Sequence, residues 1–454
     1  MTIWLPKLPD GIKNKYEAIA KAIGDDVAAG ELKPGEKLPT QRELAKRLSV
    51  TVGTVGRAYA LAEKKGFVSL ETGRGSFVRS YDFRFGSGDP EDIIDLGLNL
   101  PAVTDNGEIF SRTLAQLSNS RDIVTLFGNA PVESFERHRV AATRWLRDRL
   151  VCSPEQVLIS SGTQNALVST LATLTKPGDS VLVEELTFPG MIEAARLLNL
   201  KLVPLEMDDR GIIPTALERC ANTSGVIYCI PTNQNPTTTT MPTARRRRIA
   251  EIAKARELYI IEDDVYGKLI ADAPPPIATF AHDRTVLISS LAKTMSVGLR
   301  LAFVCVPDRL RQPIMTSLRA TNFFPSPLLC EIAANWINDN TADRLLKEQR
   351  VVALQRQEIA KDILGDELCA GNPAGNHVWL NLPDAWTGET LQRAAKENGV
   401  KLYPAAAFTT SSQAVANAVR IALGAARNES ELRVGLNVIA RLLDQGIDES
   451  RARY

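Results

Sequence analysis

The feature that most constrains the fold of this chain is an alternation, from residue 94 onward, between short apolar runs and stretches with helical spacing. Four of the apolar runs cover residues 157–160, 180–184, 225–229 and 258–262, and each has the length of a strand. This alternation predicts an α/β domain with a mostly parallel sheet. Because such sheets bind ligands beyond the carboxyl ends of their strands, the polar residues that follow the strands form the candidate site.

Length and composition limit the class of protein. The 454 residues exceed one ordinary domain and, at about 150 residues per domain, predict about three units. An apolar share of 44% and a charged share of 24% are typical of a soluble globular protein. The six cysteines are scattered without a CxxC pair and the three histidines do not cluster, so we expect reduced core cysteines and no metal site.

The sequence contains no recognisable targeting segment. Residues 1–6 are not a basic region followed by an apolar core, so we expect no signal peptide. No apolar run approaches the roughly 20 residues that span a membrane. We therefore expect a cytoplasmic protein that does not bind membranes.

The net charge of +1 is unevenly distributed along the chain. Residues 1–80 carry a net charge of +5, which leaves −4 for the remainder. A basic head on a mildly acidic body suggests a polyanionic partner for the head alone, although surface lysines explain so small an excess about as well.

Residues 13–79 contain three helical patterns and a hairpin. Apolar residues at helical spacing begin at Tyr16, and Thr40 with Glu43 forms a capping box that opens a short second helix through Leu48. Thr51 can cap a third helix that runs to about residue 65. Its apolar side comprises Val55, Ala58, Tyr59 and Ala62. Strands at 67–70 and 76–78 would pair around residues 73–75.

Three short helices followed by a hairpin form a winged helix-turn-helix, whose third helix enters the major groove of DNA. The run resembles the GntR family of bacterial regulators through Leu-Pro-x-x-Arg-x-Leu-Ala, Val-Thr-x-x-Thr-Val-x-x-Ala-Tyr and Gly-x-Gly-x-Phe-Val. We therefore expect a DNA-binding domain at 1–79 and a linker at 80–93; a module that binds protein is the alternative. The residues expected to contact DNA are Thr40, Arg42, Thr51, Thr54, Arg57 and Arg74.

The third helix departs from the GntR pattern at the positions where bases should be read. GntR proteins often carry arginine early in this helix, whereas this chain has Val52, Gly53 and Gly56. We therefore expect few base contacts, some of them apolar, and most of the polar residues on phosphates.

A lone lysine, Lys293, lies between the apolar runs 285–288 and 301–306, with Ser290 before it and Arg300 after it. In a partly desolvated pocket the pKa of its amine would fall, so that the amine could attack an aldehyde. The serine and the arginine could bind an anion beside it. Taken alone, a solvated loop lysine is the simpler interpretation.

The ends of the other strands supply a matching set of groups. Gly162, with Thr163 and Gln164, opens a helix as a phosphate cradle or as an ordinary cap. Phe188 could stack on a flat ring or pack as a hydrophobic staple. Three further polar groups follow the next two strands. They are the amide of Asn235, the phenol of Tyr266 and the carboxyl of Asp263, which could pair with a pyridinium nitrogen.

Together these groups indicate pyridoxal 5′-phosphate (PLP), and residues 95–445 resemble the fold-type I aminotransferases. The resemblance implies that Lys293 forms the Schiff base, Asp263 pairs with the ring nitrogen and Phe188 stacks on the ring. It assigns Asn235 and Tyr266 to the ring hydroxyl. The phosphate would fall to Gly162, Thr163, Gln164, Ser290 and Arg300.

Near the end of the chain, Asn417-Ala418-Val419-Arg420 matches a further motif of that superfamily, which implies that Arg420 binds a substrate carboxylate. We expect the aminotransferase-like domain at 94–454, with a small C-terminal α+β part from about 335. Phe127, Thr238 and Ala292 depart from the family pattern, and we expect each departure to remove one polar contact.

A GntR-type head fused to an aminotransferase-like domain resembles the MocR subfamily of bacterial regulators. The resemblance implies a PLP-dependent transcription factor that senses PLP or an amino compound and binds a double-stranded operator as a head-to-tail homodimer. A working aminotransferase with an attached DNA-binding head is the alternative, because Lys293, Asp263, Asn235 and Arg420 are all present. A sensor of PLP itself is a third interpretation.

Overall fold

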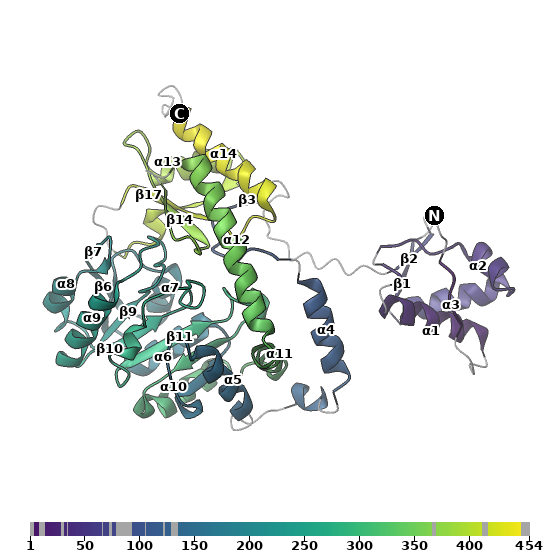
Figure 1. The fold of residues 1–454 in the computed structure, drawn as a ribbon, viewed down its shortest axis with the longest axis horizontal. Helices are drawn as coiled ribbons and strands as arrows, with labels where there is room; N and C mark the ends of the chain where they lie inside the picture. Colours follow the sequence, from purple (N-terminus) through teal and green to yellow (C-terminus); the bar gives the residue numbers. More distant parts are fainter. Residues whose placement is uncertain are drawn as a thin grey trace. The chain divides into compact units, whose positions relative to one another are not determined.

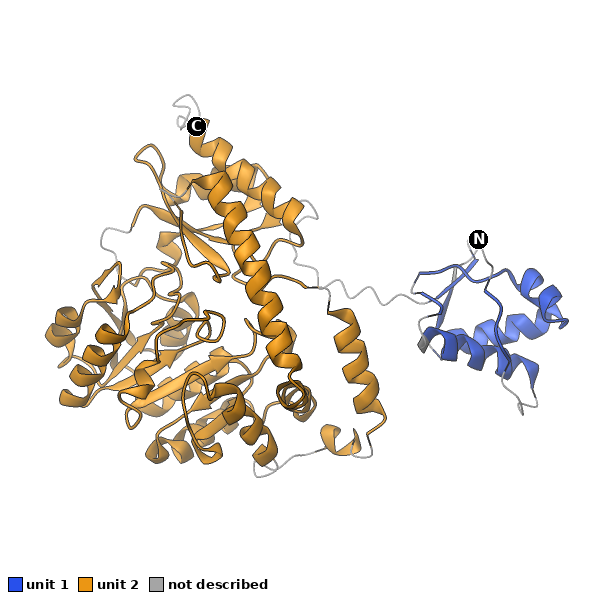
Figure 2. Cartoon of the chain, in the orientation of Figure 1, with its two compact units in different colours: residues 1–90 blue, residues 91–454 orange. Residues whose placement is uncertain are grey.

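The chain folds into two compact units, residues 1–90 and 91–454, which are coloured separately in Figure 2. This computed structural model describes residues 4–8, 14–28, 31–33, 35–65, 67–71, 75–78, 93–104, 106–120, 123–128, 135–365, 369–410 and 416–445. The boundary between the units falls inside the stretch predicted as a linker, of which only the last residue is described.

Unit 1 contains three helices and a two-stranded antiparallel sheet. The helices are α1 (Lys15–Ala28), α2 (Gln41–Arg47) and α3 (Val52–Lys64), followed by β1 (Val68–Glu71) and β2 (Gly75–Val78). The apolar side predicted for the third helix is buried throughout and packs with α1 and α2 around one core. Tyr59 in that core donates from its hydroxyl to the Pro39 carbonyl at 2.7 Å.

Both predicted helix caps of unit 1 are confirmed. Thr40 and Glu43 form the reciprocal capping box that opens α2. Thr51 accepts a hydrogen bond from the Thr54 amide at the start of α3. Because a cap satisfies amides that lack partners in the first turn, the sequence itself sets where these two helices begin.

Unit 2 is built on a seven-stranded sheet with the order β4-β12-β11-β10-β9-β5-β6. Figure 1 labels its strands β6, β9, β10 and β11. All strands run parallel except β12, which is antiparallel to both of its neighbours. The predicted mostly parallel sheet is therefore confirmed. The strands are β4 (Val157–Ser160), β5 (Ser180–Glu184), β6 (Lys201–Leu205), β9 (Val226–Cys229), β10 (Tyr259–Asp263), β11 (Thr285–Ser290) and β12 (Ala302–Cys305).

Helices cover both faces of this sheet, since alternate side chains of one strand enter different cores. Val181 and Val183 of β5 pack with five helices, whereas Leu182 faces α8 (Pro214–Cys220) and α9 (Thr243–Ala255). The first set is α5 (Glu136–Leu146), α6 (Thr163–Leu174), α7 (Pro189–Leu197), α10 (Asp308–Thr321) and α11 (Pro327–Asn338). With both faces buried, the carboxyl ends of the strands are left for a ligand.

A smaller part of unit 2 has a core of its own around a four-stranded antiparallel sheet, β13-β14-β17-β16. The long helix α12 (Thr341–Leu364) leads into it (Figure 1). Its other elements are β13 (Cys369–Gly371), β14 (His377–Asn381), α13 (Gly388–Glu397), β15 (Val400–Lys401), β16 (Tyr403–Pro404), β17 (Ala418–Ala422) and α14 (Glu429–Gln445).

Residues near the start of unit 2 join this smaller part before the main sheet begins. The short strand β3 (Ile94–Asp95) pairs in parallel with β15, and Leu96 lies in the smaller core. The chain then forms α4 (Gly107–Ser118) and a 3-10 turn, Ile123–Phe127. A small hairpin, β7 (Met207–Asp208) with β8 (Gly211–Ile212), lies beyond β6.

The cysteines are free, four of them buried and two partly buried. Within the described part of the chain, no helix combines the length and the apolar composition needed to cross a bilayer. The same residues contain no group of three or more His, Cys, Asp or Glu side chains arranged to hold a metal ion.

Candidate functional site

A cavity of about 560 Å³ opens at the carboxyl ends of the main sheet strands. The predicted site residues of unit 2 come from segments more than 250 positions apart in the sequence, yet every one of them lines this cavity. They are Gly162, Thr163, Gln164, Phe188, Asn235, Asp263, Tyr266, Ser290, Lys293, Arg300 and Arg420.

One end of the cavity is formed by the turn between β4 and α6. Gly162 caps α6 with a φ of +89°, a conformation that L side chains rarely adopt. A Cβ at this position would lie 3.7 Å from the main-chain oxygen of Arg300. Ser290 accepts a hydrogen bond from the Ala292 amide at 3.1 Å, which leaves its own hydroxyl hydrogen available. A helix N-terminus, a hydroxyl and an arginine together can hold a phosphate.

Lys293 follows β11 and points its amine toward the segment that enters unit 2. Its Nζ donates to the Asn99 carbonyl. Burial lowers the pKa of this amine to about 7, with the positive charges of Arg420 and Arg300 acting in the same direction and Asp263 opposing them. An amine with such a pKa is partly unprotonated at neutral pH and therefore nucleophilic.

Asp263 is the last residue of β10, and only one of its two carboxylate oxygens accepts a hydrogen bond from a described residue. The Tyr228 hydroxyl donates to Oδ2 at 2.9 Å, whereas buried Oδ1 has no partner among the described residues. Burial raises the pKa of this carboxyl to about 7. The sequence did not reveal Tyr228, because within an apolar strand it has the pattern of a core residue.

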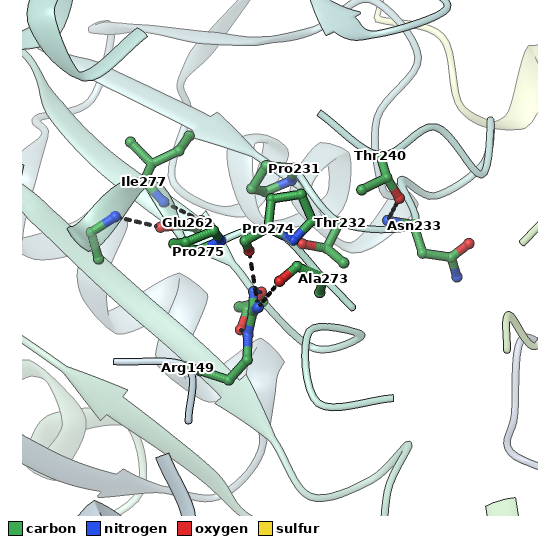
Figure 3. A network of polar contacts seen from close by, with 12 residues as sticks. Arg149, Pro231, Thr232, Asn233, Thr240, Glu262, Ala273, Pro274, Pro275 and Ile277 are labelled. Carbon is green, nitrogen blue, oxygen red and sulfur yellow. Dashed lines mark hydrogen bonds and ion pairs between the residues drawn. The ribbon is translucent and has the colours of Figure 1, made fainter. Parts of the chain in front are cut away.

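The residues on either side of Asp263 are held by polar contacts, and Figure 3 shows those made by Glu262 and by Arg149. Glu262 accepts the amides of Ile277 and Ala278 at 2.8 and 2.9 Å. Both carboxylate oxygens of Asp264 accept hydrogen bonds from Arg149, from Nη2 at 2.8 Å and from Nε at 3.0 Å. Because neighbouring strand residues point to opposite faces, these bonds hold the end of β10 while Asp263 points into the cavity.

Asn99 is a site residue that sequence reasoning missed. Its amide nitrogen donates to the Tyr266 hydroxyl at 2.9 Å and to His377 Nδ1 at 3.0 Å. His377 in turn donates from Nε2 to the Gln234 carbonyl at 3.2 Å, and burial lowers the pKa of its ring to about 3, so the ring is neutral. Asn99 follows no main-sheet strand, so no local pattern identified it.

Arg420 enters the cavity from β17 of the smaller sheet and is 5% exposed. It donates to the Asn235 side-chain oxygen at 2.8 Å and to the Gly97 carbonyl. Burial lowers the pKa of its guanidinium to about 10. No carboxylate of the described residues forms an ion pair with it, so a buried positive charge faces the cavity without a negative partner.

The three departures from the aminotransferase pattern have separate locations. Phe127 is 73% exposed at the end of the 3-10 turn. Thr238 has a φ of +64°, a conformation that favours glycine. Ala292 lines the cavity beside Lys293.

The predicted DNA-contacting residues of unit 1 lie at the start of α2 and on α3. Arg42 and Arg57 are exposed, and the Arg57 guanidinium lies 5.4 Å from the centre of the Tyr16 ring. Thr40 and Thr51 are the N-cap residues of α2 and α3, and the Thr54 amide donates to Thr51. Thr40 and Thr51 are exposed, and Thr54 is partly buried. Arg74 lies outside the described residues.

Two family models together match nearly the whole chain. The model described as "Aminotransferase class I and II" matches residues 91–439, and "Bacterial regulatory proteins, gntR family" matches residues 15–78.

Relatives with both parts are named as regulators. The chain is 33% identical over 458 residues to the HTH-type transcriptional regulator YdeF of Bacillus subtilis, with 97% of each covered. It is 27% identical to the vitamin B6 salvage pathway transcriptional repressor PtsJ of Salmonella typhimurium, with 95% of this chain and 98% of that protein covered. A solved archaeal alanine:glyoxylate aminotransferase shares the fold of unit 2 with a TM-score of 0.72 at 22% identity, over 78% of this chain and 91% of that chain.

Proposed function

The chain belongs to the MocR-type bacterial transcriptional regulators, in which a gntR-family helix-turn-helix domain is fused to an aminotransferase class I and II domain, and we propose that its cavity senses PLP or a PLP-bound amino compound. The observation that carries the proposal is the assembly of all the predicted cofactor-binding side chains in one cavity. Occupation of the cavity would then alter how the DNA-binding heads engage their operator.

The residues present fit PLP. The partnerless Oδ1 of Asp263 is a buried acceptor suited to a protonated ring nitrogen. Gly162 has a φ of +89°, so the turn at the phosphate end has a conformation that L side chains rarely adopt. Lys293 would hold the group through its amine, and Tyr266, fixed by Asn99, would face the ring hydroxyl. When bound, PLP supplies an electron sink and a visible absorption band.

The amino compound is proposed to carry a carboxylate. Arg420 is a buried cation, and such a charge is costly unless an anion or several hydrogen-bond acceptors compensate it. Its planar guanidinium can bind a carboxylate through two parallel hydrogen bonds. An effector that is PLP alone would leave this charge unmatched.

Regulation without enzymatic turnover is the activity we propose, and a working aminotransferase is the second candidate. The second is favoured by one observation: Lys293, whose pKa is lowered to about 7, lies in the same cavity as Asp263, Asn235 and Arg420. These groups suffice to move a proton on a bound amino compound. The named roles of the relatives favour the first.

A homodimer is part of the proposal. The outer side of α4 and the following turn expose large apolar side chains: Phe110 at 37%, Leu114 at 54%, Val124 at 78% and Phe127 at 73%. A second copy of the chain would bury them, and paired heads would suit an operator with two half-sites. We further propose the head-to-tail exchange of the family and, because its target is DNA, a cytoplasmic location.

The test is the visible spectrum of the purified protein loaded with PLP and titrated with amino acids and amines. A lasting shift with one carboxylate-bearing compound, which also changes DNA affinity, would support the sensor. Loss of the band followed by its restoration with a 2-oxo acid, over many cycles, would establish transamination instead. The Lys293→Ala variant is the control: if regulation persisted in it unchanged, covalent capture would be irrelevant.

A further inference from the structure

The helix α3 begins with an exposed apolar residue. Val52, the first residue of the helix, is 44% exposed, whereas Val55, Ala58 and Tyr59, which follow three to seven residues later, are buried in the head. In a helix-turn-helix domain, the residues at the start of the third helix reach the base edges in the major groove. Val52 therefore occupies a base-reading position without any hydrogen-bonding group of its own.

The polar side chains beside Val52 are largely committed to the helix. The Thr51 and Thr54 hydroxyls bond to each other at 2.8 Å, and Thr51 also accepts the Thr54 amide at 3.1 Å. In such a pair one hydroxyl hydrogen is already used, so at most one remains as a donor. The first turn is thus poor in donors for base edges, which increases the share of Val52 in recognition.

Among the described residues of the head, no close contact requires glycine at position 53. A Cβ added there would meet a single atom, Thr51 Oγ1, at 4.0 Å. By contrast, a Cβ at Gly56 would lie 3.2 Å from Gln41 Oε1, so that glycine makes room for a neighbour within the head. Glycine is a poor helix former, and Gly53 is exposed, so its lack of a side chain leaves room for an outside molecule to approach the helix closely.

We propose that Val52 is a specificity-determining residue that contacts the C5-methyl group of a thymine, and that Gly53 lets the DNA lie close to α3. Thymine is the base that presents a methyl group in the major groove, and an apolar side chain is its natural partner. This inference rests on the DNA-binding function of the head. It predicts a preference for thymine at one position of the operator.

The experiment uses the full-length protein and a pool of randomised duplexes. Binders are selected with the wild-type chain and with Val52→Ala, and the selected duplex is then remade with uracil in place of each thymine in turn. Uracil lacks only the methyl group. We expect one uracil per half-site to weaken wild-type binding about threefold to tenfold and to leave Val52→Ala binding unchanged.

Gly53→Ala tests the close approach, because it should change the stability of the head and its affinity for DNA in opposite directions. Alanine is the better helix former, so the head should melt at the same or a higher temperature. Its added methyl group should nevertheless weaken binding of the selected duplex about tenfold or more. Equal affinity of the two proteins would overturn the role of Gly53.

The remaining outcomes also decide the matter. If no uracil weakens wild-type binding, or if the same uracil weakens Val52→Ala equally, Val52 does not read a methyl group. If the wild-type chain enriches no sequence at all, the inference fails together with its premise that the head reads DNA. Enrichment that is identical for both proteins would overturn the inference alone.

Discussion

Lys293 illustrates how its surroundings prepare one side chain for covalent chemistry. An unperturbed lysine has a pKa of about 10.4 and is almost fully protonated at neutral pH. Burial lowers the pKa of Lys293 to about 7, and two arginines of the cavity contribute in the same direction. About half of its amine is therefore unprotonated at pH 7, without a separate base to remove the proton.

The rate at which Lys293 captures the aldehyde of PLP should consequently rise with pH and reach half of its maximum near pH 7. Below that pH the protonated amine has no free electron pair for attack. Rapid-mixing absorbance, followed by borohydride trapping and peptide mass spectrometry, measures the profile at this residue. Lys293→Arg should show no capture, and a midpoint near pH 10 would mean that the cavity does not lower the pKa.

Asn99→Ala should weaken PLP retention about fivefold to tenfold, because it removes the hydrogen bond that fixes the Tyr266 hydroxyl. Equilibrium dialysis of the cofactor gives the affinity. Asn417→Ala is a matched control: Asn417 donates to the Trp386 carbonyl at 2.8 Å and does not line the cavity. Equal affinities for wild type and Asn99→Ala would show that Tyr266 is held without Asn99.

At the scale of elements, the strands of the main sheet could be predicted because each is a short apolar run followed by polar residues. The same rule placed Asp263 and Lys293 in one site before any contact was known. It could not find His377, which reaches the site from β14 of the smaller sheet. Such residues are positioned by the packing of the two parts of unit 2, and no period in the sequence records that packing.

The helices of unit 1 were predictable for a different reason: their start signals are local. Thr40 and Glu43 satisfy each other's main-chain amides, so the beginning of α2 needs no tertiary contact. The predicted tip of the wing at Arg74 lies outside the described residues, and its contact with DNA stays a prediction.

Thr40→Ala should therefore destabilise α2 by about 1 kcal/mol, since it removes the side chain that caps the helix. Hydrogen exchange of the peptide covering residues 41–47 in the full-length protein reports this as roughly fivefold faster exchange. Thr40→Ser retains the hydroxyl and should exchange like the wild type. Unchanged exchange in Thr40→Ala would show that packing alone maintains the helix.

For the whole molecule, each of the two units has its own core. Unit 2 also contains buried carboxyls whose protonation is coupled to folding. Burial raises the pKa of Glu184 to about 8, although the Gln234 side chain and the Ile230 amide both donate to its Oε2. Its Oε1 has no partner among the described residues, which is consistent with a protonated carboxyl.

The pH dependence of stability follows from the direction of this shift. The folded-state pKa of Glu184, about 8, exceeds the value of 4.5 for an exposed glutamate, so the folded state binds the proton more tightly. The stabilisation is complete below pH 4.5 and is lost as the pH rises through 8.

Glu184→Gln retains an acceptor for both donors and cannot ionise. Its stability relative to the wild type should therefore increase from pH 5 to pH 9 by on the order of a few kcal/mol, measured by urea unfolding at each pH. Asp208→Asn, which alters an ion pair at the surface hairpin, is the control and should show no such gain. A constant difference between wild type and Glu184→Gln across this range would mean that Glu184 is ionised in the folded protein.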